Sequence, residues 1–168
     1  MVRLGYDAAG ASIDLPVING IFKDGTVTTR SYFNSIYIGG TSSGAANSYA
    51  FRKSTAAQDS LRNNIFVNER TGGTGKNYAV TTTAATAAAV NSNYNLLYTP
   101  NANGVLFGAG ALGVPTVDYT LASWNSATTG QDANSLVGTP NFVSATSTVP
   151  DLHLQSPTAA EAAGIAIS

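Results

Sequence analysis

The sequence predicts an all-β protein of the parallel β-helix class with about four rungs, because two units of the chain repeat in phase. The segment Asn19–Asp24 recurs as Ser48–Lys53 and again as Asn77–Thr82. The segment Ser31–Ile38 recurs as Ser60–Val67 with the same shift of about 29 residues. Repeats of this length, each too short to bury a core alone, are typical of stacked solenoid coils.

Short segments that alternate in polarity supply the expected strands. Four of them line up at matching positions: Val2–Leu4, Ile36–Ile38, Ile65–Val67 and Leu96–Tyr98. Because side chains alternate along a strand, we expect the first and third residue of each segment to point into the core. The middle residues, expected to face outward, are Arg3, Tyr37, Phe66 and Leu97.

The same alignment predicts how polar residues stack. Asn34 and Asn63 fall at equivalent positions beside a strand. Asparagine tolerates the left-handed backbone of a sharp turn, so we expect a structural amide ladder there. The alignment also places Asp24 over Lys53, an opposite-charge pair between neighbouring coils.

The repeat fades after about residue 100, which divides the chain into rungs and a cap. We assign residues 1–116 to the rungs and residues 117–168 to a C-terminal capping segment that packs with them as one domain. A short helix is expected directly after Thr120, and Trp124 is expected to cover the last rung. Two further short strands are expected at residues 141–143 and 152–154.

Composition argues against several classes of partner. Only 10% of the 168 residues are charged and the net charge is −1, so nothing global attracts nucleic acid. All eight basic residues lie within residues 1–76, which suggests a basic face on the early rungs. No apolar run approaches the roughly 18 residues of a membrane span, and the chain shows no signal peptide.

At the strings "SYFNSIYIGGTSSG" and "DSLRNNIFVNERTGGTGKNYAV" the chain resembles a known group. It is similar to the right-handed parallel β-helix repeats of large secreted surface proteins from Bacteroidetes-like bacteria. The string "YTLASWNSATTGQDANSLVGTPNFV" resembles the segment that closes such helices. The resemblance implies a right-handed β-helix, an extracellular location and a fragment of a longer protein, and it carries over no catalytic residue.

Aromatic and basic side chains on the early rungs form the candidate glycan-binding set. The tyrosines offer stacking surface to sugars, and the arginines and lysine provide bases of the kind that polysaccharide lyases use. The candidates are Tyr37, Tyr49, Arg52, Lys53, Arg62 and Tyr78. Tyr49 and Tyr78 occupy equivalent positions, so they form either a stacked aromatic ladder or a glycan platform.

Catalytic and metal chemistry has little sequence support. His153 alternates with two leucines and is expected to face solvent rather than act as a base. With one histidine, two glutamates and no cysteine, a transition-metal site is not expected, and no cofactor is assigned. Calcium stays open as a ligand, with Asp132 as the best single candidate.

Two functions from different classes remain. The first is a non-catalytic segment of a secreted or cell-surface β-helix protein with a structural or adhesive role, binding polysaccharide or cell-surface glycan. The alternative is a polysaccharide lyase or glycoside hydrolase acting on the basic face of the early rungs. The exposed strand edges of the first rung also predict a homodimer.

Overall fold

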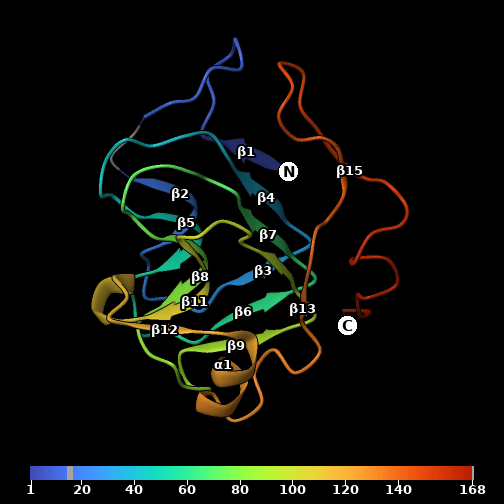
Figure 1. Ribbon diagram of the computed structural model, residues 1–168. Coiled ribbons are helices and arrows are strands. Elements are labelled where there is room, and N and C mark those ends of the chain that lie inside the picture. The colour runs from blue at the N-terminus through green and yellow to red at the C-terminus, as the bar shows by residue number, and fades with distance from the viewer. Residues whose placement is uncertain (15–16, 168) are drawn as a thin grey trace.

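The computed structural model describes residues 1–14 and 17–167. The chain winds into a parallel β-solenoid of about four turns, and each turn adds one strand to a sheet (Figure 1). Three sheets enclose a single interior, so the stacked coils bury a core that one repeat could not bury alone. The fold class expected from the repeat is therefore confirmed.

Three sheets define the faces of the solenoid. The first sheet has the order β1 (Val2–Leu4), β4 (Ser35–Ile38), β7 (Ile65–Asn68), β10 (Leu96–Tyr98) and β13 (Leu136–Val137). The second has the order β2 (Ile18–Lys23), β5 (Ser48–Lys53), β8 (Asn77–Thr82), β11 (Gly104–Ala109) and β12 (Val117–Tyr119). The third holds β3 (Arg30–Tyr32), β6 (Asp59–Arg62) and β9 (Val90–Asn93). Only β12 joins these three sheets antiparallel, among the described strands.

The observed register corrects the uniform 29-residue alignment by one residue. Tyr49 pairs with Tyr78 as predicted, but Ile36 pairs with Phe66 rather than with Ile65. A one-residue slip moves a side chain to the opposite face of a sheet. Phe66 and Leu97, expected to face outward, are therefore fully buried in the interior beside Ile36.

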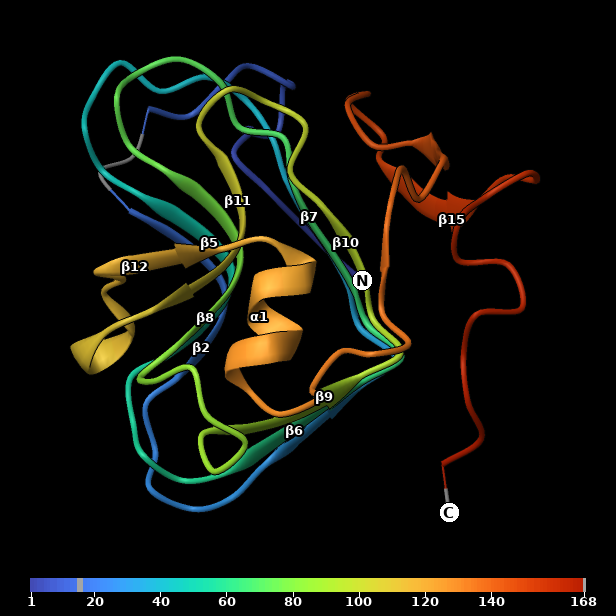
Figure 2. The ribbon, with the colours of Figure 1, turned by 60° about the horizontal axis from the view of Figure 1, so that its bottom comes forward.

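The C-terminal end of the solenoid is closed by a short helix, as expected. Helix α1 (Leu121–Ala127) begins after Thr120, whose side-chain oxygen accepts a hydrogen bond from the Ser123 amide. Figure 2 shows α1 lying across the end of the solenoid, between the three sheets. Trp124 is fully buried and stacks on Phe107 of the last full coil, with ring centroids 4.7 Å apart.

The remaining C-terminal segment lies on the outside of the first sheet. Strands β14 (Phe142–Ser144) and β15 (Asp151–Leu154) pair antiparallel, close to the ranges expected from sequence. Phe142 packs edge-on against Tyr37, and Leu152 is buried in the same small cluster. The segment thus covers a sheet face in addition to closing an end. Among the described residues, no helix is long and apolar enough to cross a membrane.

Candidate functional site

One corner of the solenoid carries large side chains in a backbone conformation that disfavours them. Phe33, Asn63 and Tyr94 each lie between a strand of the third sheet and a strand of the first, and each has a φ of 56–58°. Left-handed backbone costs roughly 1–2 kcal/mol for most residues and is least unfavourable for Gly and Asn. We call these three residues the aromatic corner.

A row of asparagines, buried in its second and third members, holds this corner in place. Asn34, Asn64 and Asn95 directly follow the three corner residues, and they form the amide ladder. The Asn64 Oδ1 accepts hydrogen bonds from the Asn34 backbone amide at 3.1 Å and from its Nδ2 at 2.9 Å. The Asn95 Oδ1 accepts from Asn64 in the same way. An amide ladder was expected, but its second member is Asn64 and not Asn63.

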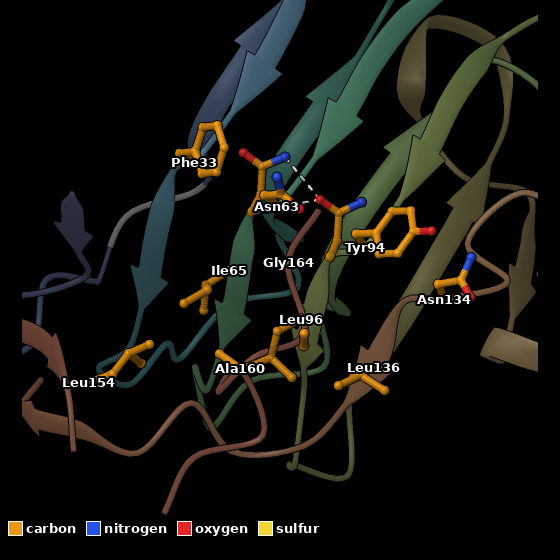
Figure 3. A pocket seen from close by; sticks show the side chains of 13 residues that line it. Phe33, Asn63, Ile65, Tyr94, Leu96, Asn134, Leu136, Leu154, Ala160 and Gly164 are labelled. Carbon is orange, nitrogen blue, oxygen red and sulfur yellow. Dashed lines mark hydrogen bonds between the residues drawn. The ribbon is translucent and has the colours of Figure 1, made fainter. Parts of the chain in front are cut away.

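Because each ladder asparagine points inward, the residue before it points outward. The Phe33 ring is 67% exposed, so it gains little packing in return for its strained backbone. Figure 3 shows the Phe33 and Tyr94 rings on either side of the Asn63 side chain. Strain without a packing gain is a reason to look for a role in binding.

A groove of about 220 Å³ lies between this corner and the C-terminal segment. Its floor is the outer surface of the first sheet, with Ile65, Leu96 and Leu136, and its opposite wall is formed by Ala160 and Gly164 (Figure 3). Small and aliphatic side chains dominate this lining. The groove is therefore mostly apolar, with asparagine amides at its upper edge.

The C-terminal segment reaches Asn63 through its backbone. The Asn63 Nδ2 donates a hydrogen bond to the Ile165 carbonyl oxygen at 2.6 Å, and the Ile165 amide donates one to the Asn63 Oδ1 at 2.9 Å. One side-chain amide thus contacts both polar groups of a single backbone residue. This geometry resembles the pairing between neighbouring strands, and it brings together two residues 102 positions apart.

Two of the candidate glycan-binding residues form the aromatic ladder. The Tyr49 and Tyr78 rings stack with centroids 5.5 Å apart and planes within 7°. Both are buried, and the Arg52 guanidinium lies 5.0 Å from the Tyr49 ring centroid. Burial and the hydrogen bond that the Tyr78 hydroxyl donates to Asp118 raise the pKa of Tyr78. Neither ring offers an open face to a sugar in this structure.

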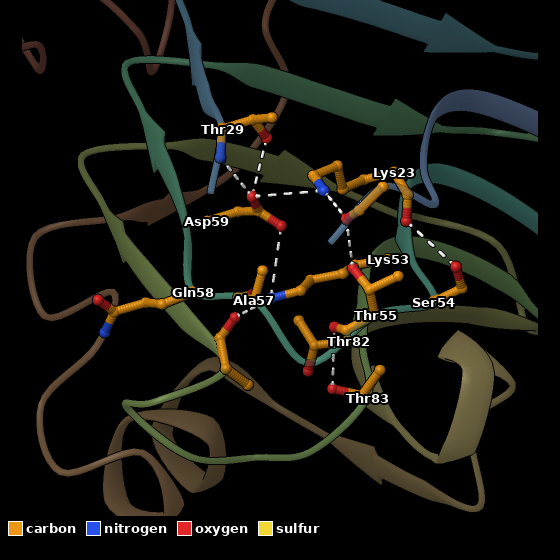
Figure 4. Close-up of polar contacts among 12 residues, drawn as sticks. Lys23, Thr29, Lys53, Ser54, Thr55, Ala57, Gln58, Asp59, Thr82 and Thr83 are labelled. Atoms are coloured by element: carbon orange, nitrogen blue, oxygen red, sulfur yellow. Dashed lines mark hydrogen bonds and ion pairs between the residues drawn. The ribbon is translucent and has the colours of Figure 1, made fainter. Parts of the chain in front are cut away.

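Lys53, another candidate, is the last residue of β5, and its side chain reaches the turn that leads to β6 (Figure 4). Its side chain is fully buried, with Nζ 3.4 Å from the Asp59 Oδ2, and it also donates to the backbone carbonyls of Ala57 and Ala89. Burial lowers the pKa of Lys53, while the Asp59 carboxylate opposes that shift. Lys53 is thus a structural ion-pair partner here.

Asp59 organises this buried cluster. Its Oδ1 accepts from the Thr29 amide at 2.7 Å and the Thr29 hydroxyl at 2.8 Å, and Lys23 lies 4.0 Å away (Figure 4). The expected stacking of Asp24 over Lys53 is wrong, because the observed register pairs Lys23 with Lys53. The Asp24 carboxylate instead accepts from the Ser54 hydroxyl.

The two candidate arginines lie closer to the surface, and they contact different neighbours. Arg52 stacks near the Phe22 and Tyr49 rings and donates to the Leu112 carbonyl oxygen at 3.2 Å. Arg62 donates to the Asn91 Oδ1 at 3.0 Å. Both side chains are half-buried and already engaged by neighbours.

Tyr37, the last candidate, lies beneath the β14–β15 hairpin. Its hydroxyl donates a hydrogen bond to the Glu69 Oε2 at 2.9 Å, and burial together with the Glu69 charge raises its pKa. A polar cavity of about 340 Å³ adjoins this pair. Tyr37 and Glu69 are therefore a second cluster of titratable groups, separate from the aromatic corner.

Asp132, considered for calcium, is a buried anchor of the cap. Its Oδ2 accepts from the Trp124 Nε1 at 3.0 Å, and its Oδ1 accepts from the Ser92 and Ser135 hydroxyls at 2.9 and 2.6 Å. Calcium takes six to eight oxygen ligands, whereas this carboxylate is surrounded by donors. No group of three or more His, Cys, Asp or Glu residues gathers within the part of the chain that the structure describes.

His153 faces solvent, as expected, with its Nδ1 2.5 Å from the Asp151 Oδ1. The aromatic corner was missed at the sequence level, although a signal was present. Phe33, Asn63 and Tyr94 each precede an asparagine, at spacings of 30 and 31 residues. Aligning those asparagines with one another would have placed all three corner residues at one position.

Comparisons with known proteins add no relative. No protein-family model matches the chain, and no curated protein or solved structure matches it.

Proposed function

We propose that this chain is a non-catalytic, structural and adhesive segment of a secreted or cell-surface β-helix protein, and that it binds glycan along the aromatic corner. The observation that carries the proposal is the exposed Phe33 ring on left-handed backbone, in line with Asn63 and Tyr94. The resemblance of the repeats to secreted surface proteins and the hydroxyl- and amide-rich composition support an extracellular setting.

The arrangement of the aromatic corner suits a polysaccharide chain lying along the solenoid axis. Neighbouring strands of a sheet are about 4.8 Å apart, so Phe33 and Tyr94, two coils apart, are about 10 Å apart. Aromatic rings provide apolar faces for sugar rings, and an amide can donate to and accept from hydroxyl groups. A glycan could therefore contact two rings and the Asn63 amide together.

Direct binding measurements test this function. The full chain would be titrated with a panel of plant, algal and bacterial polysaccharides, with and without calcium. Phe33→Asn and Tyr94→Asn remove the rings while keeping a residue that tolerates left-handed backbone. We expect each to weaken binding about tenfold, corresponding to roughly 1.4 kcal/mol.

Leu112→Asn is the matched control, because Leu112 is also left-handed and 68% exposed but follows β11 on another face. It should leave glycan affinity unchanged. If no polysaccharide binds, or if binding is insensitive to both ring substitutions, glycan recognition at the aromatic corner is wrong.

The enzymatic alternative, a polysaccharide lyase or glycoside hydrolase, is favoured by one observation. The Tyr37–Glu69 pair adjoins a polar cavity, and such groups can transfer protons. The raised pKa of Tyr37 opposes its use as a base at neutral pH, so we rank this function second. Shortening of any polysaccharide in the panel, abolished by Glu69→Gln, would reverse that ranking.

A further inference from the structure

We propose that residues 160–165 act as a displaceable strap that forms one wall of the groove beside the aromatic corner and limits access to Asn63. This inference rests on the proposed glycan site, whose regulation it describes. The Ile165 backbone amide donates to the Asn63 side-chain Oδ1, and the Ile165 carbonyl oxygen accepts one hydrogen from the Asn63 Nδ2. A glycan hydroxyl would need those same two positions.

The strap borders the groove and leaves part of the corner open. Ala160 and Gly164 line the groove opposite Leu96 and Leu136 (Figure 3), whereas the Phe33 ring stays largely exposed. The rings therefore remain available for a first contact with a sugar, while the amide between them is occupied. A glycan that displaced the strap would gain the Asn63 amide and the apolar sheet surface that the strap faces.

The strap has few contacts that would hold it against a competitor. Four of its six residues, Ala160, Ala162, Ala163 and Gly164, are small, and Glu161 and Ile165 are exposed. Among the described residues, the Glu161 Oε2 accepts only from the nearby Ser156 hydroxyl, within the same C-terminal segment. Segments with few buried apolar contacts open at low free energy. The strap is thus suited to exchange between a bound and a released position.

The chain is fixed firmly just before the strap, which defines where it would pivot. The Asn141 Nδ2 donates to the Pro157 carbonyl oxygen at 3.0 Å, and the Thr158 hydroxyl donates to the Pro140 carbonyl oxygen at 2.5 Å. These contacts keep residues 157–158 beside the first sheet. Release of Asn63 would therefore free the strap without detaching the β14–β15 hairpin.

A proline substitution in the full chain tests the strap directly. Ile165→Pro removes the amide that donates to the Asn63 Oδ1, and Ile167→Pro is the matched control beyond that contact. We expect amide hydrogen exchange within residues 159–164 to accelerate several-fold in Ile165→Pro and to stay unchanged in Ile167→Pro. Asn63→Gly, which suits the left-handed backbone, should accelerate the same amides.

Polysaccharide titration of the same proteins separates the strap from the glycan site. Loss of one or two hydrogen bonds from the competing strap should raise glycan affinity about three- to tenfold in Ile165→Pro, with Ile167→Pro equal to wild type. The strap would be overturned if amide hydrogen exchange within residues 159–164 were unchanged in Ile165→Pro. It would also be overturned if exchange accelerated but Ile165→Pro and wild type bound the glycan with equal affinity. Accelerated exchange with no glycan bound by any variant would remove the proposed function, and the gating role with it.

Discussion

At the scale of single residues, the buried cluster of Lys23, Lys53 and Asp59 shows how a charged residue can be structural. Asp59 is 1% exposed and is the only carboxylate among these three groups. Two lysines share it, and Thr29 donates two hydrogen bonds to it. Such a pair stabilises little by itself, but removing one partner leaves the other buried and uncompensated.

We therefore expect Asp59→Ala to be more damaging than Lys53→Met. Asp59→Ala should lower the free energy of unfolding by about 3–5 kcal/mol, because Lys53 would lose its buried counter-charge. Lys53→Met should cost less, since Asp59 keeps Lys23 and both Thr29 donors. Urea unfolding would measure both losses in free energy of unfolding, provided that the dependence on urea concentration is the same in both variants and wild type. A larger loss in Lys53→Met than in Asp59→Ala would contradict this account.

The identity of the corner residues illustrates the limit of sequence reasoning at this scale. The uniform 29-residue alignment matched Asn34 to Asn63, whereas the structure stacks Asn34 on Asn64. Loop lengths differ by one residue between coils, and a strand shifted by one residue reverses which side chains face out. The alignment therefore assigned Asn63 to the amide ladder, and Phe33 and Tyr94 were not recognised as residues at the same position.

At the scale of elements, the cap depends on one buried carboxylate. Asp132 joins helix α1 to the last coil, because its oxygens accept from Trp124, from Ser92 of β9 and from Ser135 before β13. Burial raises the pKa of Asp132 above its ordinary value, despite the hydrogen bonds that lower it. The contribution of Asp132 to the stability of the folded protein therefore depends on pH.

The sign of this coupling follows from the raised pKa. The folded state binds the Asp132 proton more tightly than the unfolded state, whose pKa is about 3.9. The contribution of protonated Asp132 to the free energy of unfolding is full below about pH 4. It is lost as pH rises through the pKa that Asp132 has in the folded state. We expect Asp132→Asn to lack this decline while still accepting from Trp124.

Melting temperatures measured from pH 3 upward, as differences between wild type and Asp132→Asn, check this prediction. The difference should shift in favour of Asp132→Asn as pH rises from about 4. Asp7→Asn, at the surface of an N-terminal loop, controls for loss of a carboxylate as such. Parallel pH profiles of wild type and Asp132→Asn would show that Asp132 is not the titrating group.

Element positions were more predictable than side-chain directions. The helix after Thr120 and the burial of Trp124 followed from a capping residue and a single large aromatic residue near the end of the repeat. Tyr37 faces the outside of the first sheet as expected, but its burial there could not be anticipated in the same way. It depends on Phe142, more than one hundred residues away, which folds back across the first sheet.

At the scale of the whole molecule, the repeat predicted the solenoid because stacking is the way in which short polar repeats share a core. The alignment of Tyr49 with Tyr78 in successive coils was correct for this reason. The repeat carries no information on how the C-terminal segment returns along the outside. The groove and its contact with Asn63 arise from that return, so they required the structure.

The two ends of the solenoid differ, which leads to a prediction about assembly. Helix α1 covers the C-terminal end, whereas β1, β2 and β3 each pair with a neighbour on one side only. Val2, Val17, Phe22 and Val27 are exposed at or beside these strands. Parallel edges with free backbone groups and apolar side chains pair readily with a second chain. We therefore expect a homodimer through the first coil.

Light scattering over a range of protein concentrations tests this assembly. Val2→Lys and Val17→Lys place charge at the unpaired edges, and we expect each to shift the chain toward monomer. Val149→Lys, at a still more exposed valine in the loop between β14 and β15, should not. A dimer would carry two aromatic corners, one from each chain, and so offer two glycan sites to one polymer. A monomer at every concentration would contradict pairing through the first coil and leave each chain with a single site.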